Sequence, residues 1–299
     1  MAKPHHHPGV PFPPGGQADL AARPIAPVLE KVLGRPVVID NRPGAGGAIG
    51  NAAVAKAEPD GHTLLVTLSA IVISPEAERL FGRQPLYELD QLVPVARVLS
   101  DPNVLAVPVS APWTTLKEFV DDATRRPGAI TYSSSGNYGA AHVSMELFAQ
   151  RANIKLQHVP YRGVGPALTG LISNQVSALA TAPGPVASHI EAGTVRILAS
   201  WSGARIPKLP NVPTFRELGY PSVEYYVWAG MFAPKGVPEA VMTRLRAAMR
   251  EAMNDPQVIS IFDKASIVAA YLDGPEFARF IEADSARVIP AIRRIGRLE

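Results

Sequence analysis

The spacing of apolar residues along this chain changes repeatedly between the period of a helix and that of a strand. The first long helical stripe runs over residues 18–33, with apolar positions three and four residues apart. Two prolines, Pro24 and Pro27, lie inside this stripe. Because proline within a helix costs about 3 kcal/mol, less in the first turn, we expect the helix to begin late or to kink.

The same reading extends to the rest of the chain. Short buried strands are predicted at residues 36–40, 63–67, 130–132, 157–160, 178–180 and 196–199. Helices are predicted at residues 49–57, 116–124, 142–151, 166–172, 186–191, 238–253, 256–265 and 275–294. Residues 92–109 are predicted to form two extended stretches around residues 100–103 (SDPN), and residues 223–232 are predicted to be extended as well. The alternation of strand and helix predicts an α/β protein with a parallel sheet and helices on its faces.

Composition narrows the class of protein. With 299 residues and 47% hydrophobic content, the chain can bury one large core or two medium ones. The absence of cysteine excludes disulfides, a cysteine nucleophile and cysteine-based metal centres. No apolar run reaches the roughly 18 residues of a membrane span. The net charge of +3 forms no basic stripe with interleaved aromatics, so nucleic acid is not an expected partner.

Two turns rich in glycine and proline or serine carry the candidate chemistry. Residues 13–19 (PPGGQAD) and residues 133–139 (SSSGNYG) each connect a predicted strand to a predicted helix. Glycine lets the backbone approach a ligand closely, and the first N–H groups of a helix have no partner within the helix. Together with the helix dipole, such a turn binds a carboxylate or phosphate without a basic side chain. The pair of turns therefore predicts an anion site.

Other chemistries lack their residues. No Gly-Lys-Ser/Thr follows either turn, and no Gly-x-Ser-x-Gly occurs. The glycines of residues 44–50 begin a dinucleotide-like spacing, but Ile49 stands where the third glycine belongs. No metal motif is present; Glu76 with Glu78, and Asp121 with Asp122, read as solvated helix faces. His142 reads as a packing or capping residue near a helix start. No catalytic residue, metal or cofactor is expected, and the chain is not predicted to be an enzyme.

Several motifs, in order along the chain, resemble one known family. They are VPFPPGGQAD at 10–19, NRPGAGG at 41–47, EPDGHTLL at 58–65, SSG at 134–136, VPYRGVGPAL at 159–168 and VPTFRELG at 212–219. With these motifs the chain resembles the Bug (TctC-like) receptors of tripartite tricarboxylate transporters from about residue 10 onward.

This resemblance implies a periplasmic-binding-protein fold with two α/β lobes and a ligand cleft between them. Lobe 1 would hold residues 1–105 and 230–299, and lobe 2 residues 106–229. Hinge motion of the lobes would trap the ligand. The protein would then be a periplasmic solute-binding receptor and a monomer, with membrane transporter subunits as partners, although no leader sequence is visible.

The resemblance also assigns ligand-binding residues. The carry-over places them in the two turns and at three further positions. They are Phe12, Gly15, Gly16, Gln17, Asp19, Ser69, Ser134, Gly136, Asn137, Tyr138, Ala140, Thr181 and Trp228. Tyr138 or Trp228 is expected to supply an apolar wall.

The chain departs from the family at two places. Residues 181–185 (TAPGP) lack an aspartate that many relatives carry, which favours an aliphatic or aromatic mono- or dicarboxylate over an amino acid. The run His5–His7 replaces apolar residues of the first strand and reads as a tag remnant or a frayed end, so this strand is expected to be short or altered. A sensory receptor for a membrane kinase, or an α/β hydrolase or transferase, remains an alternative.

Overall fold

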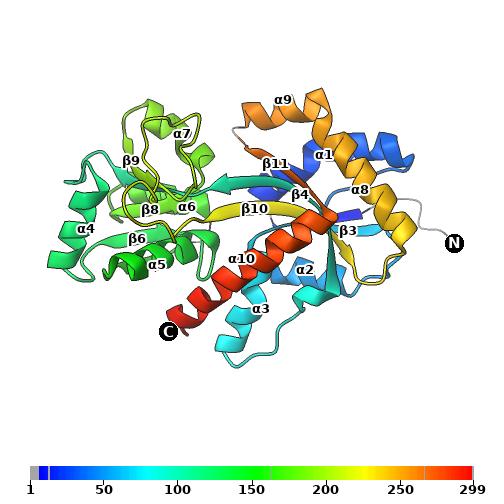
Figure 1. Ribbon diagram of the computed structural model, residues 1–299, viewed down its shortest axis with the longest axis horizontal. Coiled ribbons are helices and arrows are strands. Elements are labelled where there is room, and N and C mark those ends of the chain that lie inside the picture. Colours follow the sequence, from blue (N-terminus) through cyan, green and yellow to red (C-terminus); the bar gives the residue numbers. More distant parts are fainter. Residues whose placement is uncertain (1–6, 13, 162, 266, 298–299) are drawn as a thin grey trace. The chain divides into compact units, whose positions relative to one another are not determined.

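The computed structural model describes residues 7–12, 14–161, 163–265 and 267–297, and the chain forms two compact units within it (Figure 1). Unit 1 comprises the described residues up to Ser100 together with Trp228–Arg297, and unit 2 is Asp101–Val227. Two strands pass through these boundaries: β4 (Leu92–Pro102) and β10 (Tyr226–Pro234). The chain therefore leaves unit 1 and returns to it within regular secondary structure.

Unit 1 is built on a six-stranded sheet with the strand order β11-β4-β10-β3-β1-β2. Its other strands are β1 (His7–Val10), β2 (Asp40–Asn41), β3 (Thr63–Leu68) and β11 (Ala269–Asp273). Strand β1 pairs in parallel with β2 and β3, whereas β10 pairs antiparallel with β3 and β11 antiparallel with β4. The predicted parallel sheet is therefore a mixed one.

Helices cover both faces of this sheet (Figure 1). On one face lie α1 (Gln17–Leu33), α8 (Glu239–Asn254) and α9 (Pro256–Lys264); on the other lie α2 (Ala48–Ala55), α3 (Ala70–Leu80) and α10 (Gly274–Ile295). The side chains of strand β3 pack against both layers of helices. Leu64 and Val66 belong to the core formed with α1, α8 and α9, and Leu65 belongs to the core formed with α2, α3 and α10. This alternation is the period of two expected of a strand buried on both faces.

Unit 2 has a five-stranded sheet with the order β7-β6-β8-β5-β9. Its strands are β5 (Val104–Pro108), β6 (Thr131–Ser134), β7 (Gln157–Pro160), β8 (Ala178–Thr181) and β9 (Val195–Ser200). Its helices are α4 (Leu116–Arg125), α5 (Ala140–Ala152), α6 (Val164–Ile172) and α7 (Pro183–Glu191). Strand β6 runs parallel to β7 and β8, and β5 runs antiparallel to β8 and β9.

Helix α1 shows where packing overrides propensity. Pro24 and Pro27 both lie inside a helix that runs without interruption from Gln17 to Leu33, so the predicted late start is wrong. The helix buries its apolar stripe, including Ile25 and Leu29, against the core of unit 1. This burial offsets the two backbone hydrogen bonds that the prolines cannot make.

Other local expectations also differ from the structure. Residues 36–40 form no buried strand, because β2 is a two-residue edge strand and Val38 is exposed. Helix α3 was not predicted, since its β-branched start at Ile71-Val72-Ile73 resembles a strand. Glu76 is buried rather than solvated and accepts a hydrogen bond from Arg293 at 2.7 Å.

Candidate functional site

The turn between β1 and α1 leaves the start of a helix open. Gly15 has φ +79°, a left-handed conformation that glycine adopts without a Cβ penalty. Gly16 is the N-cap of α1 with φ −74° and ψ 166°, and no side chain caps the helix at that residue. A helix start of this kind can donate its first backbone N–H groups to an external acceptor.

The side chain of Asp19, in the first turn of α1, accepts a hydrogen bond from the backbone of this turn. Its carboxylate is 1% exposed and accepts hydrogen bonds from Gly15 N at 2.9 Å, Arg23 Nε at 2.6 Å and Asn41 Nδ2 at 3.0 Å. Burial, the largest single influence, acts to raise the pKa of Asp19, but the hydrogen bonds from Arg23, Gly15 and Asn41 outweigh it and lower the pKa. The carboxylate of Asp19 is therefore fully used in holding the turn, α1 and β2 together.

The carboxyl end of the neighbouring strand β3 presents two buried hydroxyl groups. Within the described part of the chain, neither Thr67 Oγ1 nor Ser69 Oγ has a hydrogen-bond partner, although Ser69 is only 2% exposed. The parallel register of β1 and β3 (Gly9 opposite Leu65) places Thr67 beside the residues that begin the turn. A buried hydroxyl without a partner costs about 1–3 kcal/mol, so these two groups are suited to receive a polar ligand atom.

Trp228 contributes through its backbone. Its carbonyl oxygen accepts a hydrogen bond from Ser69 N at 2.9 Å. Its indole is fully buried, donates to Asp284 Oδ2 at 2.9 Å and packs edge-on against Phe277 with ring centroids 5.2 Å apart. The structure thus places the Trp228 side chain in the core of unit 1. The backbone carbonyl of Trp228, and not its indole, holds Ser69 in position.

The turn between β6 and α5 has the same construction. Gly139 is the N-cap of α5 with φ −71° and ψ 166°, and again no side chain caps the helix there. Gly136 has φ +143° and Tyr138 has φ +56°. Ser134 Oγ accepts from Gly136 N at 3.2 Å and donates to Gly136 O at 3.0 Å, which closes the turn upon itself.

Two stacked histidines, His142 and His158, form hydrogen bonds with this turn. His142 Nδ1 accepts a hydrogen bond from Tyr138 N at 3.0 Å, so it caps the turn as expected. His158 Nε2 shares a hydrogen bond of 2.7 Å with Ser134 Oγ. Burial, with the charge of His158 as a lesser cause, lowers the pKa of His142 to about 3, and burial lowers the pKa of His158 to about 4. Both imidazoles are neutral at pH 7.

The strand next to this turn also ends in a buried hydroxyl. Thr181 is the last residue of β8 and is 3% exposed, and within the described residues its Oγ1 has no hydrogen-bond partner. The parallel register of β6 and β8 (Ser133 opposite Leu179) places Thr181 at the edge of the sheet where the turn begins. Ligands of open α/β sheets bind outside the carboxyl ends of the strands, which is where Thr181 lies.

Each unit therefore contains one half-site with the same four parts. The α1 half-site comprises the turn residues 11, 12 and 14–16, the start of α1, Asp19 and the hydroxyls of Thr67 and Ser69. The α5 half-site comprises the turn 134–139, the start of α5, His142 and the hydroxyl of Thr181. In both, a glycine N-cap begins the helix, and the side chain three residues later accepts the N–H that precedes the N-cap.

Most residues expected to bind ligand fall within these half-sites. Phe12, Gly15, Gly16, Gln17 and Asp19 lie in or directly after the first turn, with Ser69 at the end of the adjacent strand. Ser134, Gly136, Asn137, Tyr138 and Ala140 lie in or directly after the second, with Thr181 at the end of its neighbour. Asn137 is exposed and Tyr138 is buried, which leaves Asn137 the more accessible of the two.

Three contributors were not expected from the sequence: Asn41, Thr67 and His158. Asn41 donates both to Asp19 and to Phe12 O, at 3.0 and 2.9 Å. Thr67 and His158 lie in strands that were predicted, but a strand's neighbours in its sheet determine which groups meet its polar side chains. The register of β1 with β2 and β3, and of β6 with β7, reveals these three residues.

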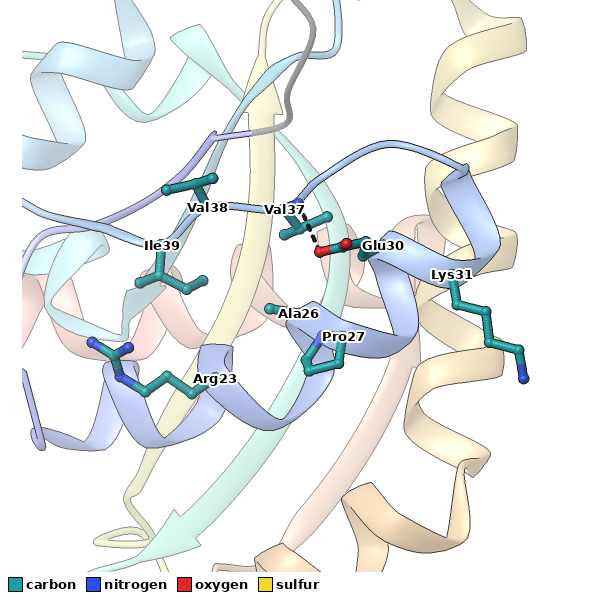
Figure 2. A pocket seen from close by; sticks show the side chains of 8 residues that line it. All are labelled: Arg23, Ala26, Pro27, Glu30, Lys31, Val37, Val38 and Ile39. Atoms are coloured by element: carbon teal, nitrogen blue, oxygen red, sulfur yellow. Dashed lines mark hydrogen bonds between the residues drawn. The ribbon is translucent and has the colours of Figure 1, made fainter.

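A separate groove lies on the outer side of α1 (Figure 2). It measures about 680 Å³ and is formed by α1 and the segment leading to β2. Glu30 and Val37 face each other across it, joined by a 3.5 Å hydrogen bond from Val37 N to Glu30 Oε2, and Lys31 points away (Figure 2). None of its lining residues was predicted to bind ligand, and its Arg23 is already paired with Asp19.

Metal binding and membrane insertion find no support in the described residues. Among them, no three histidine, aspartate or glutamate side chains are arranged to hold a metal ion. No helix within the described ranges has the length and apolar character required to span a bilayer. His5 and His6 of the histidine run lie outside the described residues, and His7 begins β1.

Comparison with known proteins identifies the family. The model of the tripartite tricarboxylate transporter family receptor (TctC) matches residues 21–297. The chain belongs to this family. BugT of Bordetella pertussis is 34% identical over 96% of this chain and 88% of its own length. The Bug (TctC) family is one of solute-binding receptors and not of enzymes, as the motifs predicted.

Solved structures of similar proteins share the fold over nearly the whole chain. A periplasmic transporter protein has a TM-score of 0.85 and 33% identity, with 97% of this chain and 96% of that chain covered. MatC of Rhodopseudomonas palustris, solved with bound malate, has a TM-score of 0.83 and 28% identity (98% and 100% covered). Rpa4515 of R. palustris, solved with adipate, has a TM-score of 0.84 and 29% identity (97% and 96% covered). The expected periplasmic-binding-protein fold is confirmed.

Proposed function

We propose that this TctC-family receptor captures a small organic carboxylate in the periplasm and delivers it to membrane subunits of a tripartite tricarboxylate-type transporter. The observation that carries this proposal is the repeated half-site. Each unit begins a helix at an uncapped glycine with nearly the same φ and ψ, next to a strand that ends in a buried hydroxyl without a partner.

The chemistry of each half-site fits a carboxylate oxygen. Backbone N–H groups at a helix start donate to an anion, and the helix dipole adds a favourable field. A hydroxyl such as that of Thr181 or Ser69 supplies one more donor. Hydrogen bonds to a charged acceptor contribute about 1.5–3 kcal/mol each, so a few of them account for the roughly 8 kcal/mol of a micromolar site.

One ligand is proposed to contact both half-sites, with units 1 and 2 acting as the two lobes that close upon it. The family relationship supports this, because periplasmic binding proteins close around ligands by hinge motion. Strands β4 and β10, which contain the boundaries between the units, are the proposed hinge segments.

The ligand is proposed to be an aliphatic or aromatic mono- or dicarboxylate and not an amino acid. MatC and Rpa4515, the structural relatives described above, were solved with the dicarboxylates malate and adipate. The connection from β8 into α7 reads Thr181-Ala182-Pro183-Gly184 and contains no acidic side chain to pair with an ammonium group. An amino acid would therefore leave its positive charge without a partner there.

Calorimetry of the purified chain with a panel of ligands tests this function. The panel contains malate, adipate, benzoate, propionate, glutamate and the diamide of adipic acid. We expect at least one carboxylate to bind at micromolar concentration and to raise the melting temperature, because a ligand that binds only the native state stabilises it. Tight binding of glutamate with no binding of the other carboxylates contradicts the proposed class, and a silent panel contradicts the function.

Matched variants connect the binding to the half-sites. Thr181→Val and Ser69→Ala remove the two hydroxyls, and each is expected to lower the affinity about tenfold, the value of one hydrogen bond to a charged group. Thr124→Val is the control, because its hydroxyl donates to Val120 O within α4 and belongs to neither half-site. If Thr181→Val and Ser69→Ala both bind as tightly as Thr124→Val, the ligand does not occupy these half-sites.

A further inference from the structure

The two half-sites differ in charge at one equivalent position. In the α1 half-site, Asp19 accepts the N–H of Gly15; in the α5 half-site, His142 accepts the N–H of Tyr138. Both acceptors stand three residues after a glycine N-cap. The first turn of α1 thus contains a carboxylate, whereas the first turn of α5 contains no acidic residue.

This difference changes the field at the two helix starts. A carboxylate in the first turn of a helix already occupies the favourable field of the helix dipole and repels a second anion. Arg23 pairs with Asp19, but its side chain is half-exposed and solvent screens it. At the start of α5 the dipole meets no such charge, so an anion there finds the stronger attraction.

The surroundings of His142 keep the α5 half-site free of charge. His158 stacks on His142 with ring centroids 3.9 Å apart and an interplanar angle of 4°. Two parallel cations at this separation would repel each other strongly. Tyr132 stacks on His158 at 5.0 Å, and the Tyr132 hydroxyl donates to Glu146 Oε1 at 2.6 Å. Burial raises the pKa of Glu146, the one acidic side chain bonded to this cluster among the described residues.

A second observation marks the same half-site as a place for ligand. Thr181 Oγ1, buried and without a partner among the described residues, lies at the end of the strand beside the turn. The α5 half-site therefore combines an uncapped helix start, an unsatisfied hydroxyl and an absence of acidic capping.

We propose that His142 determines where a carboxylate of the ligand lies: a carboxylate binds at the start of α5, and the α1 half-site takes the remaining part of the ligand. This inference rests on the proposed function and extends it. His142 acts as a positioning residue, because it bonds to the turn and not to the ligand. It supplies the acceptor that the turn requires without adding a negative charge.

Substitutions at His142 separate its two properties. His142→Asn keeps a neutral acceptor for Tyr138 N, His142→Asp keeps an acceptor but adds the negative charge found in the α1 half-site, and His142→Leu removes the acceptor. The probe is the carboxylate of highest affinity from the panel above, and its uncharged counterpart is the compound in which every carboxyl group is replaced by a primary amide. We expect His142→Asn to bind the carboxylate within about threefold of wild type and His142→Asp to bind it at least tenfold more weakly, about 1.4 kcal/mol.

Binding of the amide separates an effect of charge from damage to the turn. A variant that merely distorts the turn weakens binding of the amide and of the carboxylate alike. Because the amide carries no charge at the pH of the experiment, His142→Asn and His142→Asp should bind it equally well. His142→Leu should weaken both probes, because the turn loses its acceptor. Equal carboxylate affinities for His142→Asn and His142→Asp overturn the inference.

A second pair of variants, matched in size, tests the effect of charge without altering the buried His142. Ala140 is the first residue of α5 and is partly exposed, so Ala140→Asp and Ala140→Asn differ only in charge at the same helix start. The Asp variant should bind the carboxylate at least tenfold more weakly than the Asn variant; equal affinities place the charge elsewhere. If wild type itself binds no carboxylate, the proposed function fails first; if it binds and both pairs are insensitive to charge, only the inference fails.

Discussion

The imidazoles of His142 and His158 lie face to face, with ring centroids 3.9 Å apart and planes 4° from parallel. Each also makes one hydrogen bond to the turn 134–139, His142 to Tyr138 N and His158 to Ser134 Oγ. Since Nδ1 of His142 accepts a hydrogen bond, protonation of that nitrogen breaks the contact. The conformation of the turn therefore depends on a neutral His142.

The stability of the protein should fall as the pH falls below about 6.5. The unfolded histidines have the ordinary pKa near 6.5, and the folded pKa values are about 3 for His142 and about 4 for His158. The unfolded state thus binds more protons between these limits, so their stabilising contribution is complete above pH 6.5 and is lost toward pH 4 and below. Each histidine contributes a slope of at most about 1.4 kcal/mol per pH unit. Urea unfolding at pH 7.0, 6.0, 5.0 and 4.5 measures this.

A double variant identifies the source of that slope. His142→Asn with His158→Gln keeps hydrogen-bonding groups at both positions but cannot titrate, so its free energy of unfolding should change less over the same range. Glu146 acts in the opposite direction, because its pKa is raised and the folded state gains a proton as the pH falls. An equal slope in wild type and double variant would assign the pH dependence to other groups.

His158 should affect binding through Ser134. His158→Gln places an amide near the position of Nε2 and retains the hydrogen bond to Ser134 Oγ, whereas His158→Leu removes it. Loss of one such bond is worth about 0.5–1.5 kcal/mol. Calorimetry should therefore show a loss of up to about tenfold in carboxylate affinity for the Leu variant and near-native affinity for the Gln variant. Equal weakening in both variants would mean that packing of the ring, and not its hydrogen bond, holds the turn.

The secondary structure around the α5 half-site was predictable, but the support of its turn was not. Glycine-rich turns and helix starts are local features, and residues 133–139 show them directly in the sequence. The stack of His142 on His158 joins a helix to a neighbouring strand 16 residues away, and the pairing of β6 with β7 sets it. No local pattern contains that pairing.

The same limit applies to contacts in unit 1. Asp19 stands in a turn motif and was expected to bind ligand, but Arg23 and Asn41 occupy its carboxylate. Glu76 was expected to lie on a solvated helix face, yet it is buried and bonds to Arg293, far along the chain. Asn41 is distant in sequence from Asp19, and Arg293 from Glu76, so a sequence read segment by segment cannot supply these contacts.

Gly15 allows a test of the α1 half-site that separates binding from stability. Its φ of +79° and the open space around it mean that Gly15→Ala strains the backbone without a steric clash. Gly82 has φ +67° with the same open space, and it follows the end of α3 that is opposite to Ser69. Both alanine variants should lose about 1–2 kcal/mol of stability, but only Gly15→Ala should also weaken carboxylate binding. Melting temperatures and calorimetry on the two variants decide this; equal binding by both would remove the turn from the site.

Substitution of Trp228 tests whether its side chain contacts the ligand, as expected of an apolar wall of the site. In Trp228→Phe the ring still packs near Phe277, but Asp284 loses the hydrogen bond from the indole nitrogen. Since Asp284 is buried and retains its pair with Arg287, we expect a loss of about 1–3 kcal/mol in the free energy of unfolding. Carboxylate affinity should change less than threefold, because the Trp228 carbonyl still holds Ser69 N. A loss of affinity above tenfold with unchanged stability would show that the indole itself lines the site.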